Sequence, residues 1–207
     1  MVFPMCASLA IPKLMSARLE ANQRAAVATM RSIASGEAVF QNTGVLDLDR
    51  DGAGEYGTLA ELSGQLPLRG SKEVLEPEIL PFRNIKDGIV TRSGYHFAVF
   101  LPGKKKGTFV EPKSQDGSDV NANEAEISFI VQAWPVDAPE TGRCVYCFDQ
   151  EGDLVCCENP GCTYSGLEHR LAFDAYRPAD PSVDPASGKP YVGRDGKTWV
   201  LVPDPRR

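Results

Sequence analysis

The stretch LAIPKLMSARLEANQRAAVATMRSIASGEAVFQ, residues 9–41, carries an apolar stripe with the period of an α-helix. Its members recur at steps that keep side chains on one helix face. They are Met15, Leu19, Ala26, Met30, Ile33 and Phe40. Pro12 stands near the start, where a proline begins or bends a helix instead of breaking its middle. About 30 residues of helix would reach roughly 45 Å, which exceeds the breadth of a small domain.

We therefore predict one helix from near Pro12 to near Phe40. Its Met30, Ile33 and Phe40 end packs on a sheet, and its other end projects. The alternative is a core helix that a sheet covers along its whole length.

Composition indicates an ordinary globular chain. Of 207 residues, 42% are hydrophobic and 24% are charged, which suits one domain or one domain with an extension. The net charge of −6 argues against a nucleic-acid partner, and the basic run KKK at 104–106 is typical of a solvated loop tip. No stretch reaches the roughly 20 apolar residues of a membrane span, and no secretory signal is recognisable. The chain as given is therefore expected to be soluble.

Past the helical segment (1–41), the chain divides into three further sections. Residues 42–87 form an irregular, acidic and glycine-rich region in which GTLAELSG holds one short helical turn. Residues 88–177 carry strand patterns and a cysteine cluster. Residues 178–207 are rich in proline, aspartate and glycine, with one late strand from Thr198 to Val202.

The third section predicts consecutive antiparallel strands. GIVTRSGYHFAVFLPG reads as two strands around a Ser-Gly turn, with Tyr95, Phe97 and Val99 on one side. AEISFIVQAWPVD alternates from Ile127 through Phe129, Val131 and Ala133, and RCVYCFDQEGDLVCCEN reads as a hairpin. Strands that follow one another without intervening helices favour a meander. The predicted fold class is α+β, with a long N-terminal helix packed on an antiparallel sheet.

Several segments resemble bacterial type IV pilins and type II secretion pseudopilins. AIPKLMSARLEANQRAAVATMRSIASGEAVFQ is similar to their N-terminal helix. The segments DRDGAGEYGTLAEL, SGYHFAVFLPG, AWPVD and TGRCVYCFDQEGDL resemble the parts that follow it, in the same order. The similarity covers roughly residues 9–155.

The resemblance implies a pilin-like fold and a structural role without catalytic residues. Such a subunit assembles through its helix into a pilus or a secretion pseudopilus. Its partners are copies of itself, other pilin-like subunits and the assembly or secretion machinery. The complete protein would be extracytoplasmic, held in the membrane only through a helix segment upstream of Met1, where the leader is also expected.

The acidic run DLDRDGAGE opens like a calcium-binding loop. Asp47, Asp49 and Asp51 alternate ahead of a glycine, and Glu55 follows, a pattern in which carboxylates converge on a hard cation. Thr58 stands where a bidentate glutamate would complete an EF-hand. The residues therefore leave two interpretations open, a calcium site and a solvated acidic turn.

The cysteine cluster also has two interpretations. Its members are Cys144, Cys147, Cys156, Cys157 and Cys162, with Cys6 apart. A two-residue turn at Glu151-Gly152 would place Cys147 opposite Cys156, which predicts a cross-strand disulfide. Cys157 and Cys162 would then close a short loop, or Cys144 would take one of them. An exported protein favours disulfides. The alternative is a small metal-binding (zinc) or redox domain.

Hydrolytic chemistry has little support in the sequence. The only histidines are His96, in a predicted strand, and His169, in a polar segment. No phosphate-binding loop, dinucleotide fingerprint or nucleophile elbow occurs. The chain is therefore predicted not to be an enzyme.

Overall fold

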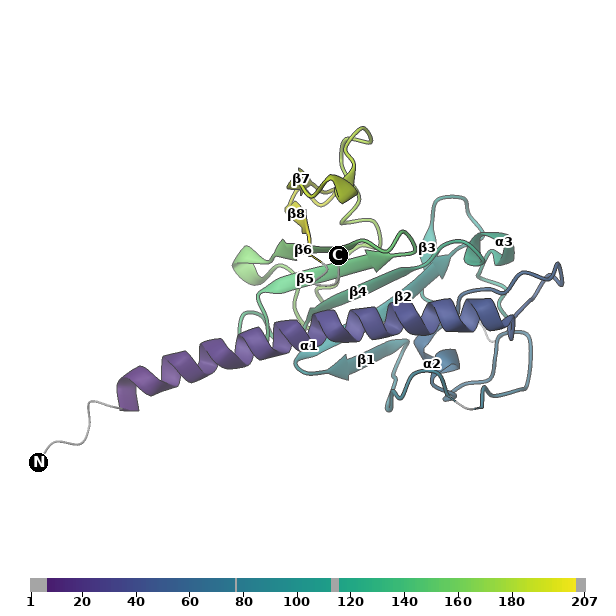
Figure 1. Cartoon of the computed structure of the whole chain (residues 1–207), viewed down its shortest axis with the longest axis horizontal. Helices are drawn as coiled ribbons and strands as arrows, with labels where there is room; N and C mark the ends of the chain where they lie inside the picture. Colours follow the sequence, from purple (N-terminus) through teal and green to yellow (C-terminus); the bar gives the residue numbers. More distant parts are fainter. Residues whose placement is uncertain (1–6, 77, 113–115, 204–207) are drawn as a thin grey trace, which may run out of the picture.

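One long helix dominates the structure, a computed structural model that describes residues 7–76, 78–112 and 116–203, with side chains described from Lys13 onward. Helix α1 (Ala7–Thr43) has 37 residues, about 55 Å at 1.5 Å per residue. Figure 1 shows that its C-terminal half runs along the sheet, whereas its N-terminal part extends past it. The predicted projecting helix is confirmed. Cys6 and the side chain of Pro12 lie outside the described residues.

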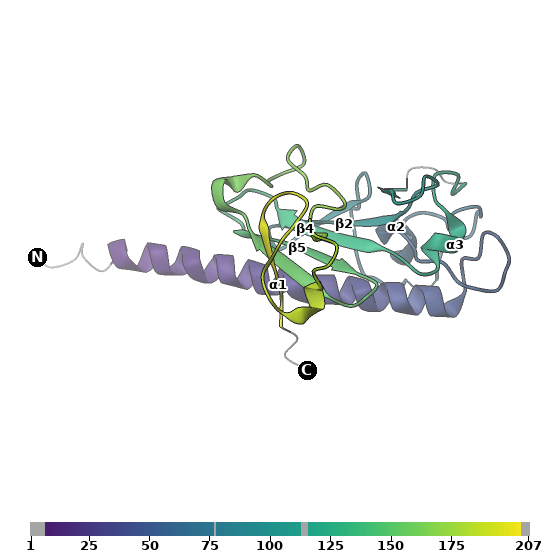
Figure 2. The same ribbon diagram turned by 90° about the horizontal axis from the view of Figure 1, so that it is seen from above.

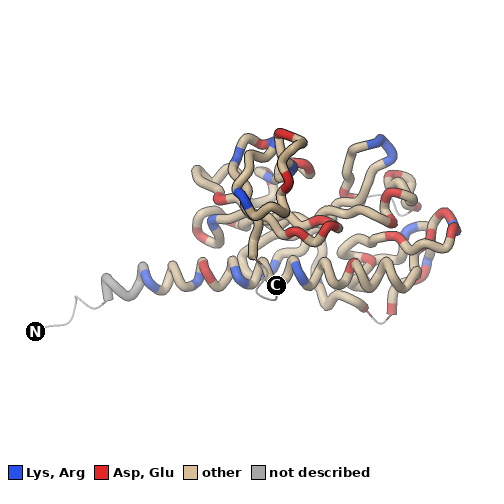
Figure 3. The backbone as a smooth tube through the Cα atoms, turned by 45° about the horizontal axis from the view of Figure 1, so that its top comes forward, with Lys and Arg blue, Asp and Glu red and all other residues tan. Residues whose placement is uncertain are grey.

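The projecting part of α1 is exposed over the first side chains that the structure describes. Every residue of 13–18 is exposed, including Leu14 at 73% and Met15 at 51%. Contact with the rest of the chain is fixed one turn later, where Asn22 Nδ2 donates to the Thr141 carbonyl at 2.9 Å. Figure 3 marks charged positions along the N-terminal part of α1, which are Lys13, Arg18, Glu20 and Arg24.

Eight strands, counted over the described residues, form one sheet in which every pairing is antiparallel. The spatial order is β1-β2-β4-β5-β6-β8-β7, and β3 pairs with β2. The strands are β1 (Ile89–Arg92), β2 (Tyr95–Pro102), β3 (Phe109–Val110), β4 (Ile130–Pro135), β5 (Cys144–Asp149), β6 (Leu154–Glu158), β7 (Tyr191–Val192) and β8 (Thr198–Leu201). The predicted meander and the late strand are both confirmed.

The first hairpin follows its sequence signal. Arg92 pairs with Tyr95, which leaves a two-residue turn of Ser93 and Gly94 with φ of 49° and 75°. Positive φ at both positions is the turn whose twist matches that of the flanking strands. The predicted Ser-Gly turn is therefore confirmed.

Both faces of the sheet are covered. Alternation along β2 places Tyr95, Phe97 and Val99 in the core that faces α1, with Met30, Ile33 and Phe40 from the helix. The opposite core contains Trp134 from β4 and these residues from the C-terminal part of the chain: Tyr164, Leu171, Tyr176, Tyr191 and Trp199. Figure 2 shows α1 and the C-terminal segment from above. Because both faces are buried, all of β2 and β4 is buried.

The start of the third predicted strand is wrong. Residues Ala122–Ala125 form the short helix α3, capped by the Asn121 side chain, and β4 begins only at Ile130. Phe129, Val131 and Ala133 join the core that faces α1 as predicted. Ile127 is 68% exposed, because the chain is still turning out of α3 at that point.

Short elements complete the fold. The predicted helical turn is α2 (Leu59–Leu62), in which Thr58 and Glu61 form a capping box. Two 3₁₀ turns, η1 (Pro160–Cys162) and η2 (Pro185–Ser187), lie in the C-terminal part.

Candidate functional site

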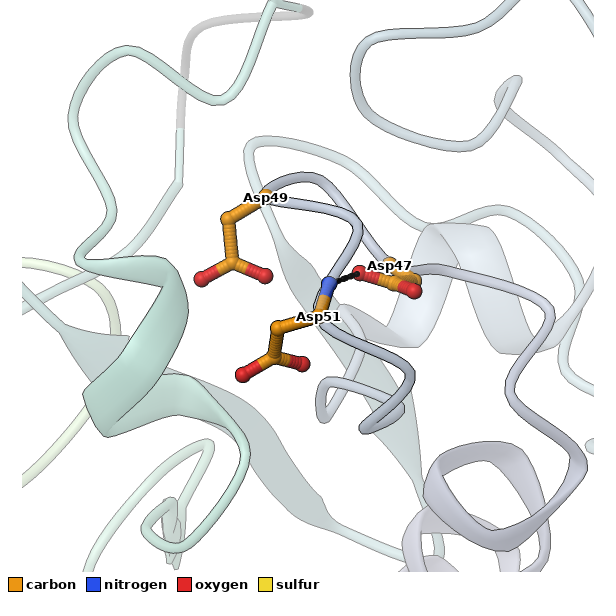
Figure 4. Close-up of side chains that lie close together, drawn as sticks. All are labelled: Asp47, Asp49 and Asp51. Atoms are coloured by element: carbon orange, nitrogen blue, oxygen red, sulfur yellow. Dashed lines mark hydrogen bonds between the residues drawn. The ribbon is translucent and has the colours of Figure 1, made fainter.

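The acidic loop lies directly after α1. Carboxylate oxygens of Asp47, Asp49 and Asp51 all lie within 4.8 Å of one another, the only such group of potential metal ligands in the part of the chain that the structure describes. Figure 4 shows the Asp49 and Asp51 carboxylates on one side of the loop, with Asp47 bonded to the backbone of Asp51. The sequence-predicted triad is therefore brought together.

Asp47 organises the loop. Its carboxylate accepts backbone N–H groups from Arg50 at 2.6 Å, Asp51 at 3.2 Å and Gly52 at 3.1 Å. Aspartate side chains commonly fold a turn in this way. Gly52 has a φ of 95°, which glycine adopts without a steric penalty. Asp49 accepts the amide of Asn123 at 2.6 Å, so the loop is also tied to α3.

Glu55, the predicted fourth ligand, lies elsewhere. Its side chain is buried, with 1% exposed, and Oε1 accepts the Leu48 backbone N–H at 2.8 Å. Oε2 faces Arg69 Nη2 at 3.8 Å. The prediction of Glu55 as a calcium ligand is wrong, because its carboxylate is buried and bonded to the backbone of the loop at Leu48.

Glu126, immediately after α3, is the acidic neighbour that the sequence reasoning missed. Its Oε1 is buried and has no hydrogen-bond partner among the described residues. Burial raises the pKa of Glu126, and the carboxylates of Asp51, Asp49 and Asp47 raise it further. A divalent cation bound beside the three aspartates would offset the negative charge that acts on Glu126.

A second polar group lies inside the protein next to the acidic loop. It consists of Glu37, Glu55, Glu61 and Arg69, all buried. Arg69 donates from Nε to Glu61 Oε1 at 3.0 Å and from Nη2 to the Tyr56 carbonyl at 2.6 Å. We call these four residues the buried ionic cluster. It joins α1, the acidic loop and α2.

The cysteine hairpin has a different register from the one predicted. Tyr146 pairs with Cys156, and Cys147 pairs with Val155. The turn is one residue longer than predicted, because the Asp149 carbonyl accepts the Gly152 N–H at 3.1 Å and Gly152 adopts a φ of 87°. A one-residue slip moves every side chain to the other face.

The predicted Cys147–Cys156 disulfide is wrong for this reason. Cys144 and Cys156 lie on the face that packs toward α1, whereas Cys147 and Cys157 lie in the opposite core. All five described cysteines are free thiols. The other predicted pairings, Cys157 with Cys162 or Cys144 with one of them, are therefore wrong as well.

The same geometry weighs against the zinc and redox alternative. Residues three apart on a strand point to opposite faces, so Cys144 and Cys147 cannot share one ion or form one redox pair. Burial raises the pKa of Cys156 to about 12 and that of Cys157 to about 11. Reactive thiols require the opposite shift.

The predicted assembly residues of the helix separate into two groups. Met15 is exposed and Leu19 is half-buried. Ala26, Met30 and Ile33 are completely buried against the sheet. The prediction that the second group takes part in assembly is wrong. These side chains form the core of this chain and offer no surface to another copy.

His96 is a buried residue of the sheet. It lies on β2, and its Nδ1 forms a 2.8 Å hydrogen bond with the Thr91 hydroxyl. Burial lowers the pKa of His96, and the charge of Arg170 lowers it further. One groove, of about 630 Å³, is lined by Asp87, Glu111 and Arg170 among other residues, and by neither histidine.

Comparisons of the chain with family models, curated proteins and solved structures found no match. Among the described helices, none combines the length and the apolar character needed to cross a membrane.

Proposed function

We propose that this chain is a structural subunit of a type IV pilus-like filament or a type II secretion pseudopilus, assembling through α1. The observation that carries the proposal is the division of α1 into a covered half, at its C-terminal end, and a bare segment, residues 13–18. The covered half fixes the direction of the helix, because Met30, Ile33 and Phe40 are completely buried. The bare segment presents Leu14 and Met15 to a partner.

Packing between copies would remove this apolar surface from water. Full burial of a leucine or methionine side chain is worth roughly 1.5–3 kcal/mol. The outer face of α1 also offers places for close helix contact, since small side chains stand between larger exposed ones such as Arg18, Glu20 and Arg24. The small exposed residues are Ser16, Ala17, Ala21, Ala28, Ser32, Ser35 and Ala38. The partners are copies of this chain or other pilin-like subunits, together with their assembly machinery, outside the cytoplasm.

A double variant, Leu14→Asp with Met15→Asp, tests the proposal. Burying the new charges between subunits should lower the recovery of sheared filaments or pseudopili from producing cells by at least ~10-fold. The free energy of unfolding should change by less than about 0.5 kcal/mol per site, because both side chains are exposed.

Leu167→Asp is the matched control, since Leu167 is 59% exposed and lies outside α1. It should leave recovery unchanged. If filaments of the double variant were recovered in the wild-type amount, the bare segment of α1 would not be part of the assembly surface.

We also propose that the acidic loop binds calcium through Asp47, Asp49 and Asp51, with Glu126 beside them. Bound calcium would raise the free energy of unfolding by roughly 2.7 kcal/mol at a free concentration near 100 Kd. Calorimetry should show calcium-dependent heat, and millimolar calcium should raise Tm.

Asp49→Asn with Asp51→Asn should abolish both effects. Asp87→Asn, an exposed aspartate of another loop with a φ of 49°, should abolish neither. Absence of heat and of any Tm rise in the wild type would leave the loop as a solvated acidic turn.

A further inference from the structure

The buried ionic cluster contains more acid than base. Glu37 on α1, Glu55 in the acidic loop, Glu61 on α2 and Arg69 are 0%, 1%, 2% and 4% exposed. When all are ionised, three carboxylates face one guanidinium. An uncompensated charge in the interior is costly, and a proton on one carboxylate removes the cost.

Glu37 is the least supported of the three carboxylates. Its Oε2 accepts the Gly57 backbone N–H at 2.9 Å, whereas its Oε1 is buried without a hydrogen-bond partner in the described part of the chain. Arg69 pairs with the other two glutamates, at 3.0 Å from Glu61 and 3.8 Å from Glu55.

The charged and titratable groups that act on Glu37 come from the elements packed against it. Glu61 and Arg69 face it from the α2 side, and Tyr56 faces it from the loop. Burial raises the pKa of Glu37 to about 8; the Gly57 N–H opposes this shift, Glu61 adds to it and Arg69 opposes it.

We propose that Glu37 is a proton-operated latch that holds the loop of residues 44–58 on α1. With its proton, Glu37 is a neutral group that the interior accepts, and the loop stays closed over it. Without the proton, Glu37 is an ionised carboxylate with a single backbone donor, and opening the loop restores its hydration. We expect the sheet to stay paired, because β4 is hydrogen-bonded to β2 and β5 and not to the loop, although opening removes Leu46 of the loop from the core that faces α1.

The direction of the pH dependence follows from linkage. The closed loop keeps a proton that the open loop releases, from the ordinary carboxyl pKa of 4.5 up to about 8. Stabilisation of the closed loop is therefore complete below that interval and is lost as pH rises through it. The ratio of open to closed loops should rise by up to ~10-fold per pH unit within the interval.

Amide hydrogen exchange of the whole chain tests this inference. After correction for chemical exchange, the opening ratio at Gly57 should rise by nearly ~10-fold per pH unit between about pH 5 and pH 7.5. The amides of β4 should show no such rise. Glu37→Gln, which mimics the protonated side chain, should make the Gly57 profile much less steep, and the remaining slope should come from Glu55, whose pKa burial also raises.

Glu20→Gln is the matched control on the same helix, since Glu20 is exposed and pairs with the exposed Arg24. It should keep the wild-type slope. An equal slope in Glu37→Gln, or parallel opening of Gly57 and β4, would overturn the latch. Carbon NMR of the Glu37 carboxyl in the wild type measures its pKa directly. A pKa below 5 would also overturn the latch.

Discussion

Replacement of Arg69 with methionine is expected to destabilise the protein by about 3–5 kcal/mol near pH 8, because it leaves buried carboxylates without their counter-charge. Arg69 is 4% exposed, and its Nε and Nη2 groups bond Glu61 and the Tyr56 carbonyl. Chemical denaturation followed by circular dichroism measures the loss. The deficit should shrink toward pH 5, since protonated carboxyls no longer require the guanidinium.

Arg83→Met is the matched control. Arg83 also pairs with a glutamate, Glu78, at 2.9 Å, but its side chain is 71% exposed. Solvent-exposed pairs contribute only about 0–1 kcal/mol. Equal effects of the two substitutions, or a deficit at Arg69 that does not change with pH, would contradict the account of the buried ionic cluster.

Phe40→Ala is expected to cost about 3–5 kcal/mol, the usual loss for a buried aromatic side chain. Phe40 is completely buried, and its ring lies so close to Gly57 that a Cβ there would approach it to 2.9 Å. The ring therefore packs the end of α1 against both the core and the loop.

Val39→Ala separates this packing loss from any general effect on the helix. Val39 is the preceding residue of α1 and is 50% exposed, so its substitution should change the free energy of unfolding by less than about 0.5 kcal/mol. A small loss at Phe40, comparable with that at Val39, would mean that the C-terminal half of α1 is not anchored as described.

The helix and most strands were predictable because their signals are local. The spacing of Met30, Ile33 and Phe40 already marks the face that the sheet covers, and the alternation in β2 marks its two sides. The cysteine hairpin was not predictable at the level of register. A two-residue and a three-residue turn both fit FDQEGDL, and only the φ of Gly152 and its bond to Asp149 decide which cysteines share a face.

The candidate site divides in the same way. Asp47, Asp49 and Asp51 are close in sequence, so their spacing is sufficient to predict the triad. Glu126 lies beside the triad because α3 ends just before it. Glu55 points into the protein, because its carboxylate accepts the Leu48 N–H and pairs with Arg69. Glu37 lies in the helix segment that the apolar stripe describes, yet its burial depends on a loop some twenty residues further along the chain.

Photo-crosslinking from α1 in producing cells tests the assembly proposal most directly. A photo-reactive amino acid at the position of Leu14, 73% exposed, should give a ladder of covalent dimers and larger multimers that contain this chain or other pilin-like subunits. The same group at the position of Leu167 should give none of them. Monomer alone from the position of Leu14, in cells where the protein is folded and abundant, would contradict assembly through α1.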